Sequence, residues 1–223
     1  MRIIAVSNQK GGTAKTTTAW AILTGAAIRG RHVLGIDYDP QGSLTFMMGE
    51  GNREGKIVHT KAGDYIPARM DIAGIKDVNQ LSDSLKDFRK QYDIIVIDSP
   101  PTLGKPFIAS LIAATETIIP LQADPLSIQG LFLMRNAIDQ IKPTIAITGA
   151  FFARHNGRSV ISRDLGETIR DKCEELHIPF IDAPIREGVA IREAQLLKEP
   201  IFTYAPRSNP AKDYSAFLDA IKI

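Results

Sequence analysis

The chain has 223 residues, 44% of them hydrophobic, and a formal net charge of +2. This composition is typical of a globular domain and excludes collagen-like, intrinsically disordered and low-complexity chains. The single cysteine, Cys173, excludes an internal disulfide and a cysteine-based zinc cluster. No apolar run approaches the roughly 20 residues that span a bilayer, and Met1–Lys10 lacks the apolar stretch of a signal peptide. We therefore expect a soluble protein from a reducing compartment.

Short β-branched runs alternate with longer amphipathic stretches along the chain. The expected strands are Arg2–Val6, Val33–Ile36, Ile94–Ile97, Thr117–Pro120 and Ile145–Phe151. The expected helices are Thr16–Arg29, Asn79–Lys90, Ile128–Ile141, Ser159–His177 and Pro210–Ile221. Because strands that alternate with helices imply crossover connections, we expect one α/β domain over residues 1–223, with a doubly wound, mostly parallel sheet and helices on both faces. Gly49–Gly63, rich in glycine and charge, is expected to be an exposed loop.

The segment Asn8–Thr18 (NQKGGTAKTTT) follows the first expected strand and opens the first expected helix, which is the setting of a phosphate-binding loop. Gly11 and Gly12 allow the backbone to approach a polyphosphate closely, and the N–H groups at a helix N-terminus favour its negative charge. Lys15 is expected to reach the terminal phosphates, and the hydroxyl of Thr16 is expected to ligate Mg²⁺.

This loop departs from the usual pattern G-x-x-x-x-G-K-[ST], because Gln9 and Ala14 occupy the two glycine positions. It fits K-G-G-x-x-K-[ST], with an additional lysine at Lys10, and in this it resembles the ParA/MinD family of ATPases. The resemblance implies a P-loop NTPase fold of the deviant Walker A class. That family usually has glycine where Ala14 stands. Because a Cβ at positive φ costs on the order of 1 kcal/mol, we predict a negative, helical φ at Ala14.

Two acidic segments follow expected strands. Asp37 and Asp39 lie in DYDPQG at residues 37–42, and Asp98 ends the apolar strand before the loop Ser99–Gly104. The carboxyl ends of neighbouring parallel strands meet at one edge of a sheet, beside the phosphate loop. Mg²⁺ prefers oxygen ligands, and a hydrolytic water needs a positioned acceptor. These carboxylates therefore predict a site for a magnesium nucleotide.

The family resemblance assigns roles to these residues. It implies that Asp39 positions the attacking water, that Asp37 supports the metal through water, and that Asp98 is the Walker B acid. It also implies that Lys10 reaches across a dimer to the nucleotide of the other subunit, so that Lys10, Lys15 and Asp39 are the catalytic residues. Thr16, Asp37 and Asp98 are the expected metal residues. The expected nucleotide-binding residues are Lys10, Gly11, Gly12, Thr13, Ala14, Lys15, Thr16, Thr17, Pro206 and Ser208.

Further matches to the ParA pattern lie in the second half of the chain. The segment 122–130 resembles the family's dimer face, and the loop 204–208 resembles the loop that closes over the adenine, here with Pro206 and Ser208. Phe152–His155 is expected to flank the base from the other side. ParA dimers bind DNA without sequence preference through basic side chains of this region, and phosphate contacts make such binding sensitive to salt. The basic residues here are Arg186, Arg192, Lys198, Arg207 and Lys212.

The resemblance as a whole implies a partitioning ATPase with ATP and Mg²⁺ as cofactors. Such a protein dimerises around two ATP molecules, binds nonspecific DNA, and is released by weak hydrolysis that a ParB-type partner stimulates. The cargo would be a plasmid or a chromosome, and the location cytoplasmic and associated with the nucleoid. The net charge of +2 is small for a dedicated DNA-binding domain, so a DNA surface must come from local placement of charge.

Other functions of the same superfamily remain open. A MinD-like ATPase ends in a basic amphipathic helix on lipid, whereas Asp213–Ile223 carries two acids and one lysine and is typical of a packing helix, so we expect no membrane partner. A positioner of protein cargo shares the same DNA cycle, and the sequence does not separate it. A nitrogenase-type reductase needs bridging cysteines, which this chain lacks. A non-catalytic module is disfavoured because Lys15, Thr16, Asp39 and Asp98 are intact.

Overall fold

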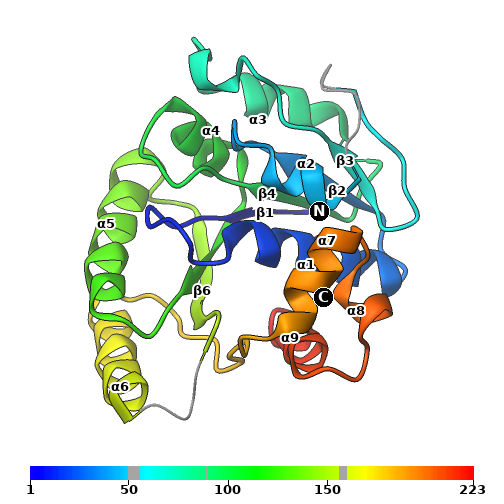
Figure 1. Ribbon diagram of the computed structural model, residues 1–223. Helices are drawn as coiled ribbons and strands as arrows, with labels where there is room; N and C mark the ends of the chain where they lie inside the picture. The colour runs from blue at the N-terminus through cyan, green and yellow to red at the C-terminus, as the bar shows by residue number, and fades with distance from the viewer. Residues whose placement is uncertain (50–55, 89, 156–159) are drawn as a thin grey trace.

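The computed structural model describes residues 1–49, 56–88, 90–155 and 160–223 (Figure 1). Its strands are β1 (Arg2–Val6), β2 (Val33–Asp37), β3 (Asp64–Ile66), β4 (Ile94–Asp98), β5 (Glu116–Leu121) and β6 (Ala146–Phe152). They form one six-stranded sheet in the order β3-β2-β4-β1-β5-β6, and every pairing between them is parallel. The expected parallel α/β fold is confirmed.

Helices cover both faces of this sheet (Figure 1). They are α1 (Lys15–Ile28), α2 (Ser43–Met47), α3 (Gln80–Ser84), α4 (Lys105–Ala113), α5 (Pro125–Ile141), α6 (Val160–Glu175), α7 (Val189–Leu197), α8 (Ile201–Tyr204) and α9 (Asn209–Ala220), with 3₁₀ turns at Ile72–Gly74 and Leu85–Phe88. Helices α1, α7 and α9 lie together on one side, and α4 and α5 lie on the other. Two cores follow from this arrangement, one on each face of the sheet.

The central strands β1, β2 and β4 are mostly apolar because their side chains serve both cores. In β1, Ile3 and Ala5 belong to one core, whereas Ile4 and Val6 belong to the other. Successive side chains of a strand point to opposite faces, so a strand covered on both faces needs no polar side. This explains why the central strands could be predicted from short β-branched runs.

The strand register brings three chain segments together at the carboxyl edge of the sheet. Asp98 at the end of β4 pairs with Val6 at the end of β1 on one side and with Asp37 at the end of β2 on the other. The loop after β1 and the two acidic segments therefore meet at the place where open α/β sheets bind their ligands.

Several expected elements differ from the observed ones. The expected helix Asn79–Lys90 is a short helix, α3, followed by a 3₁₀ turn, and residue 89 lies outside the described residues. Five short elements were not predicted, namely β3, α2, α4, α7 and α8. Of the expected loop Gly49–Gly63, residues 50–55 lie outside the described part, and Val58 forms an isolated antiparallel bridge to Tyr65.

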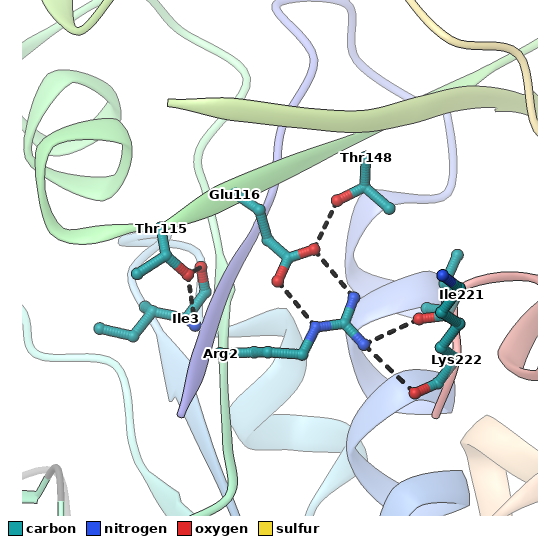
Figure 2. A network of polar contacts seen from close by, with 7 residues as sticks. All are labelled: Arg2, Ile3, Thr115, Glu116, Thr148, Ile221 and Lys222. Atoms are coloured by element: carbon teal, nitrogen blue, oxygen red, sulfur yellow. Dashed lines mark hydrogen bonds and ion pairs between the residues drawn. The ribbon is translucent and has the colours of Figure 1, made fainter. Parts of the chain in front are cut away.

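A network of polar contacts holds the last residues of the chain against the sheet (Figure 2). Arg2 donates from Nε and Nη2 to the two carboxylate oxygens of Glu116, at 2.8 Å each. Its Nη1 donates to the carbonyl oxygen of Ile221 at 2.7 Å, and Thr148 donates to Glu116 at 2.5 Å. Because the guanidinium bridges a strand and the end of α9, it fixes that helix relative to the sheet.

Helix α9 is a core element. Its residues Tyr214, Phe217 and Leu218 are buried in the same core as α1. An apolar face that is already buried is not available to lie on a lipid surface. In the part of the chain that the structure describes, no helix has the length and apolar character that crossing a membrane requires.

Candidate functional site

The loop between β1 and α1 ends at a helix N-terminus that faces a cavity. Ala14 is the N-cap residue of α1 and provides no side-chain hydrogen bond to the first turn. Residues of the loop and the first turn line a cavity of about 470 Å³; they are Gly11, Gly12, Ala14, Lys15, Thr16 and Thr17. The first N–H groups of a helix have no acceptor within the helix, so an uncapped N-terminus on a cavity suits a polyphosphate.

Two side chains tie this loop to the neighbouring strand β5 and the segment that follows it. Asn8 donates to the carbonyl oxygen of Pro120 at 2.8 Å and accepts from the backbone N–H of Lys10 at 2.9 Å. Gln122 donates to the carbonyl oxygen of Gly12 at 3.0 Å. These contacts fix the conformation of the loop. The loop residues that line the cavity can then bind a ligand without being needed to hold the loop in shape.

Lys15 is buried at the base of the cavity, and its Nζ donates to the carbonyl oxygen of Lys10 at 2.9 Å. Burial lowers its pKa, and the carboxylates of Asp98 and Asp39 partly oppose that shift. A cation held by its own loop and facing two carboxylates is in place to exchange the carbonyl contact for a phosphate oxygen.

The prediction of a negative φ at Ala14 is wrong. Its φ is +66° and its ψ is +29°, in the left-handed region, and Gly12 also has a positive φ of +77°. Two residues of the loop, Gly12 and Ala14, thus adopt the left-handed conformation, although Ala14 carries a Cβ. The backbone geometry of the phosphate loop thus prevails over the steric preference of alanine.

This strain leads to a stability prediction for Ala14→Gly. The substitution removes the strained Cβ but adds conformational freedom to the unfolded chain, and the first effect exceeds the second at a left-handed position. We expect the free energy of unfolding to rise by about 0.5–1 kcal/mol. Urea denaturation of the nucleotide-free chain measures this, with Ala26→Gly, inside α1, as a control that should destabilise. An unchanged or lower stability of Ala14→Gly would contradict the account.

Lys10 lies on the other side of the loop and pairs within its own chain. Its Nζ forms an ion pair with the carboxylate of Asp124. Asp124 is also the N-cap of α5, where its Oδ1 accepts from the backbone N–H of Ser127 at 3.1 Å. Lys10 is not among the described residues that line the cavity, and its ammonium is engaged by Asp124 instead.

Asp98 is fully buried at the end of β4, and neither of its carboxylate oxygens has a hydrogen-bond partner among the described residues. Burial raises its pKa well above the ordinary value of 3.8, the nearby carboxylate of Asp37 adds to the shift, and the Thr16 hydroxyl and Lys15 only partly oppose it. An unpartnered buried carboxylate is costly unless a cation joins it. Asp98 and Thr16 thus offer oxygen ligands that fit Mg²⁺, which binds through few protein groups together with phosphates and water.

The two carboxylates of the segment 37–42 have different surroundings. Asp37 is buried, and its Oδ2 accepts from the backbone N–H and the hydroxyl of Thr45, at 2.6 and 2.7 Å. Burial raises the pKa of Asp37, and the bonds from Thr45 partly oppose the rise. Asp39 lines the nucleotide-sized cavity and accepts from the backbone N–H of Gln41 at 3.0 Å. Asp39 thus lies where a ligand can reach it, while both carboxylate oxygens of Asp37 accept hydrogen bonds from the chain itself.

The rest of the cavity lining comes from residues to which the sequence analysis assigned no role. They come from α2, the segments after β4 and β6, α7 and α9: Ser43, Met47, Pro101, Ile185, Glu187, Gly188, Ile191, Gln195 and Tyr214. Gln195 of α7 donates to the hydroxyl of Thr17 at 2.9 Å, which joins α7 to the phosphate loop. Arg154, within the expected flanking segment Phe152–His155, also lines the cavity, whereas Phe152 is buried in the core.

The expected adenine residues lie elsewhere in the described chain. Ser208 is the N-cap of α9, where its hydroxyl accepts from the backbone N–H of Ala211 at 3.3 Å. Neither Ser208 nor Pro206 belongs to the described lining of the cavity. Their contact with a base stays a prediction, and the segment Ile185–Gly188 contributes to the cavity directly.

The five basic residues expected on a DNA surface divide into two groups. Arg186 and Arg192 line the cavity, and Arg186 forms an ion pair with Asp213 at 2.6 Å. Lys198, Arg207 and Lys212 are exposed, and the ammonium of Lys198 lies 5.0 Å from the ring centre of Phe46. All five side chains are exposed, so exposure alone does not select which of them contact a DNA backbone.

Comparison with known proteins gives the following relationships. The model of the CobQ/CobB/MinD/ParA nucleotide binding domain matches residues 4–201. The chromosome partitioning protein ParA of Myxococcus xanthus is 30% identical over 96% of this chain and 86% of its own length. The sporulation initiation inhibitor protein Soj of Bacillus subtilis is 29% identical over 96% and 95%. Among solved structures, cobyrinic acid a,c-diamide synthase of Mycobacterium smegmatis, with bound ATP analog and magnesium, is 29% identical over 100% of this chain and 94% of that one, with a TM-score of 0.84.

Proposed function

The chain belongs to the CobQ/CobB/MinD/ParA nucleotide-binding family, and from this we propose that it is a partitioning ATPase that uses ATP and Mg²⁺ to switch between a free and a DNA-bound state. The observation that carries this proposal is the phosphate loop with two lysines, of which one faces the cavity and one does not. Relatives named as ParA and Soj, matched over nearly the whole chain, support the partitioning role.

Different residues of the site have different roles in ATP binding and hydrolysis. The N-terminus of α1 and Lys15 would bind the phosphates, and Thr16 and Asp98 would hold Mg²⁺. Asp39 accepts a hydrogen bond from the attacking water and orients it toward the terminal phosphate. When bound, Mg²⁺ supplies positive charge that stabilises the phosphates during transfer. Ile185 and Gly188 line the same cavity, and the proposal assigns the nucleoside to them.

Lys10 acts in a dimer. Lys15 already serves the phosphate site of its own chain, and Lys10 points to Asp124, away from that site. In the proposed dimer each Lys10 leaves Asp124 and approaches the nucleotide of the partner, where it stabilises the charge that develops on the transferred phosphoryl group. ATP binding then promotes dimerisation, and hydrolysis promotes dissociation.

The ATP-bound dimer binds nonspecific DNA through the exposed basic residues near the C-terminal end, and two copies double the patch. A ParB-type centromere-binding partner stimulates hydrolysis and releases the dimer from DNA. The proposed cargo is a plasmid or chromosome, and the proposed location is the nucleoid. The burial of the apolar face of α9 favours this DNA cycle over a membrane cycle.

A DNA-retention experiment tests the proposed function. We expect nonspecific DNA to retain the chain with ATP, but not with ADP or without nucleotide, and we expect retention to fall steeply between about 50 and 200 mM salt. A variant with Arg207→Ala and Lys212→Ala should reduce retention and the salt slope. Lys61→Ala with Lys90→Ala, which removes the same charge from other exposed positions, is the control. Equal retention in all three nucleotide states would contradict the proposal.

A further inference from the structure

The carboxylate of Asp37 is directed to a helix rather than to the nucleotide cavity. Its Oδ2 accepts both the backbone N–H and the hydroxyl of Thr45, at 2.6 and 2.7 Å, and its Oδ1 accepts the backbone N–H of Asp39 at 3.3 Å. Asp37 is not among the described lining residues of the nucleotide cavity; it lines a second cavity of about 630 Å³ together with Tyr38. These contacts connect α2 to the backbone of the loop that carries Asp39.

Thr45 has a second connection on its other side. Its hydroxyl oxygen accepts the backbone N–H of Ala68 at 2.8 Å, and the residue is fully buried. One hydroxyl therefore joins the end of β2, helix α2 and the segment after β3. A buried hydroxyl with a charged acceptor and a backbone donor has a fixed orientation, because both of its hydrogen-bonding roles are filled.

The same helix contributes to the nucleotide cavity. Ser43 and Met47, one turn apart on α2, line that cavity, and so does Asp39 in the preceding loop. Thr45 lies between them in the sequence and points to Asp37. The position of α2, and with it the turn from Asp37 to Ser43, is thus determined by a contact outside the cavity.

We propose that Thr45 is a positioning residue for hydrolysis, acting through Asp37 to hold Asp39 where it orients the attacking water. This inference rests on the proposed function of Asp39. It gives Asp37 an anchoring role, in place of the water-mediated support of the metal that the family resemblance implied. The proposal predicts that the hydrolysis rate depends on Thr45, whereas binding of nucleotide and Mg²⁺ does not, since that binding rests on Lys15, Thr16 and Asp98.

Three variants test the proposal. Thr45→Val keeps the shape and the backbone N–H but removes the hydroxyl, whereas Thr45→Ser keeps the hydroxyl. Thr117→Val is the matched control, because Thr117 is equally buried and its hydroxyl donates to the carbonyl oxygen of Ala5 at 3.0 Å, within the strands β5 and β1. Hydrolysis rate, KM for ATP, and ADP affinity with and without Mg²⁺ are measured for each, with melting curves to confirm folding. If Thr45→Val does not fold, Thr45→Ala replaces it.

We expect Thr45→Val to lower kcat by roughly tenfold, while nucleotide affinity and its dependence on Mg²⁺ stay within about threefold of the original chain. Thr45→Ser and Thr117→Val should retain most of the rate. The proposal is overturned if Thr45→Val hydrolyses ATP as fast as Thr117→Val, or if its nucleotide affinity falls as much as kcat. Thr45→Ser as slow as Thr45→Val would also overturn it. Dimerisation and DNA retention by the unaltered chain test the proposed function separately.

Discussion

Replacing Asp98 with asparagine is expected to stabilise the nucleotide-free chain and to abolish the additional stabilisation that Mg²⁺ gives the nucleotide-bound chain. The carboxylate of Asp98 is fully buried and has no hydrogen-bond partner among the described residues, so the folded state bears the cost of its desolvation. Removing the ionisable group should raise the free energy of unfolding at neutral pH by about 1–3 kcal/mol. The same change removes an oxygen ligand with the charge that Mg²⁺ requires.

The gain in stability should depend on pH in a defined direction. Burial raises the pKa of Asp98 in the folded chain well above 3.8. As the pH rises from about 4, the unfolded chain loses this proton first, the folded chain keeps it, and the stability contributed by Asp98 falls until its folded pKa is passed. The asparagine variant does not titrate at this position. The difference in free energy of unfolding between this variant and the original chain should therefore be small near pH 4 and should grow as the pH rises to neutral.

Melting curves with and without Mg·ADP measure both effects. A ligand that binds only the folded chain raises its stability with the logarithm of the ligand concentration divided by Kd. Loss of the Mg²⁺ contribution therefore appears as a smaller rise in melting temperature when Mg·ADP is added. Asp93→Asn is the matched control, because Asp93 precedes the same strand at its other end, is exposed, and accepts from the backbone N–H of His32 at 3.0 Å. A full Mg²⁺ response in Asp98→Asn would contradict the assigned metal site.

Replacing Lys10 with alanine should weaken ATP-dependent dimerisation and lower the hydrolysis rate on the order of 10²-fold. Binding of ATP to the single chain should change little, because Lys15 and the N-terminus of α1 remain. The reason is that the ammonium of Lys10 pairs with Asp124 and does not face the phosphate site of its own chain. Sedimentation, steady-state hydrolysis and nucleotide titration measure the three properties on one preparation.

Asp124→Asn distinguishes the role of Lys10 from that of its ion pair. Asparagine is also a good N-cap, so α5 should keep its first turn, while the charge opposite Lys10 is removed. If Lys10 acts on the partner's nucleotide, this variant should still dimerise with ATP. An equal loss of binding, dimerisation and hydrolysis in Lys10→Ala would instead place Lys10 in the nucleotide site of its own chain.

The parts of the structure that could be predicted are those encoded by short contiguous segments. Strand β4 is apolar on both faces, and the loop Asn8–Thr18 carries its lysines and glycines in one run, so both were recognisable without tertiary information. Their proximity at one edge of the sheet could also be predicted, because the carboxyl ends of parallel strands lie side by side. The two acidic segments were found for the same reason, because each directly follows a strand.

The parts that could not be predicted depend on contacts between distant segments. Helices α2 and α7 are short, and α7 contributes Ile191 and Gln195 to the cavity only because the chain returns to the phosphate loop after β6. The contact between Asp37 and Thr45 is set by the placement of α2, which has no sequence periodicity to reveal it. At Ala14 the local steric rule pointed to the wrong sign of φ, since the loop geometry prevails there.

The most direct test of the central claim, that Lys10 acts on the partner's nucleotide, is the ATPase activity of a mixture of Lys10→Ala and Asp39→Ala chains. The first lacks the donated cation but has an intact Asp39, and the second supplies Lys10 but lacks the water-orienting carboxylate. In a mixed dimer, the site of the Lys10→Ala chain receives Lys10 from its partner. The account predicts that the mixture hydrolyses ATP much faster than either variant alone. Activity equal to the sum of the two separate variants, with mixed dimers shown to form, would contradict it.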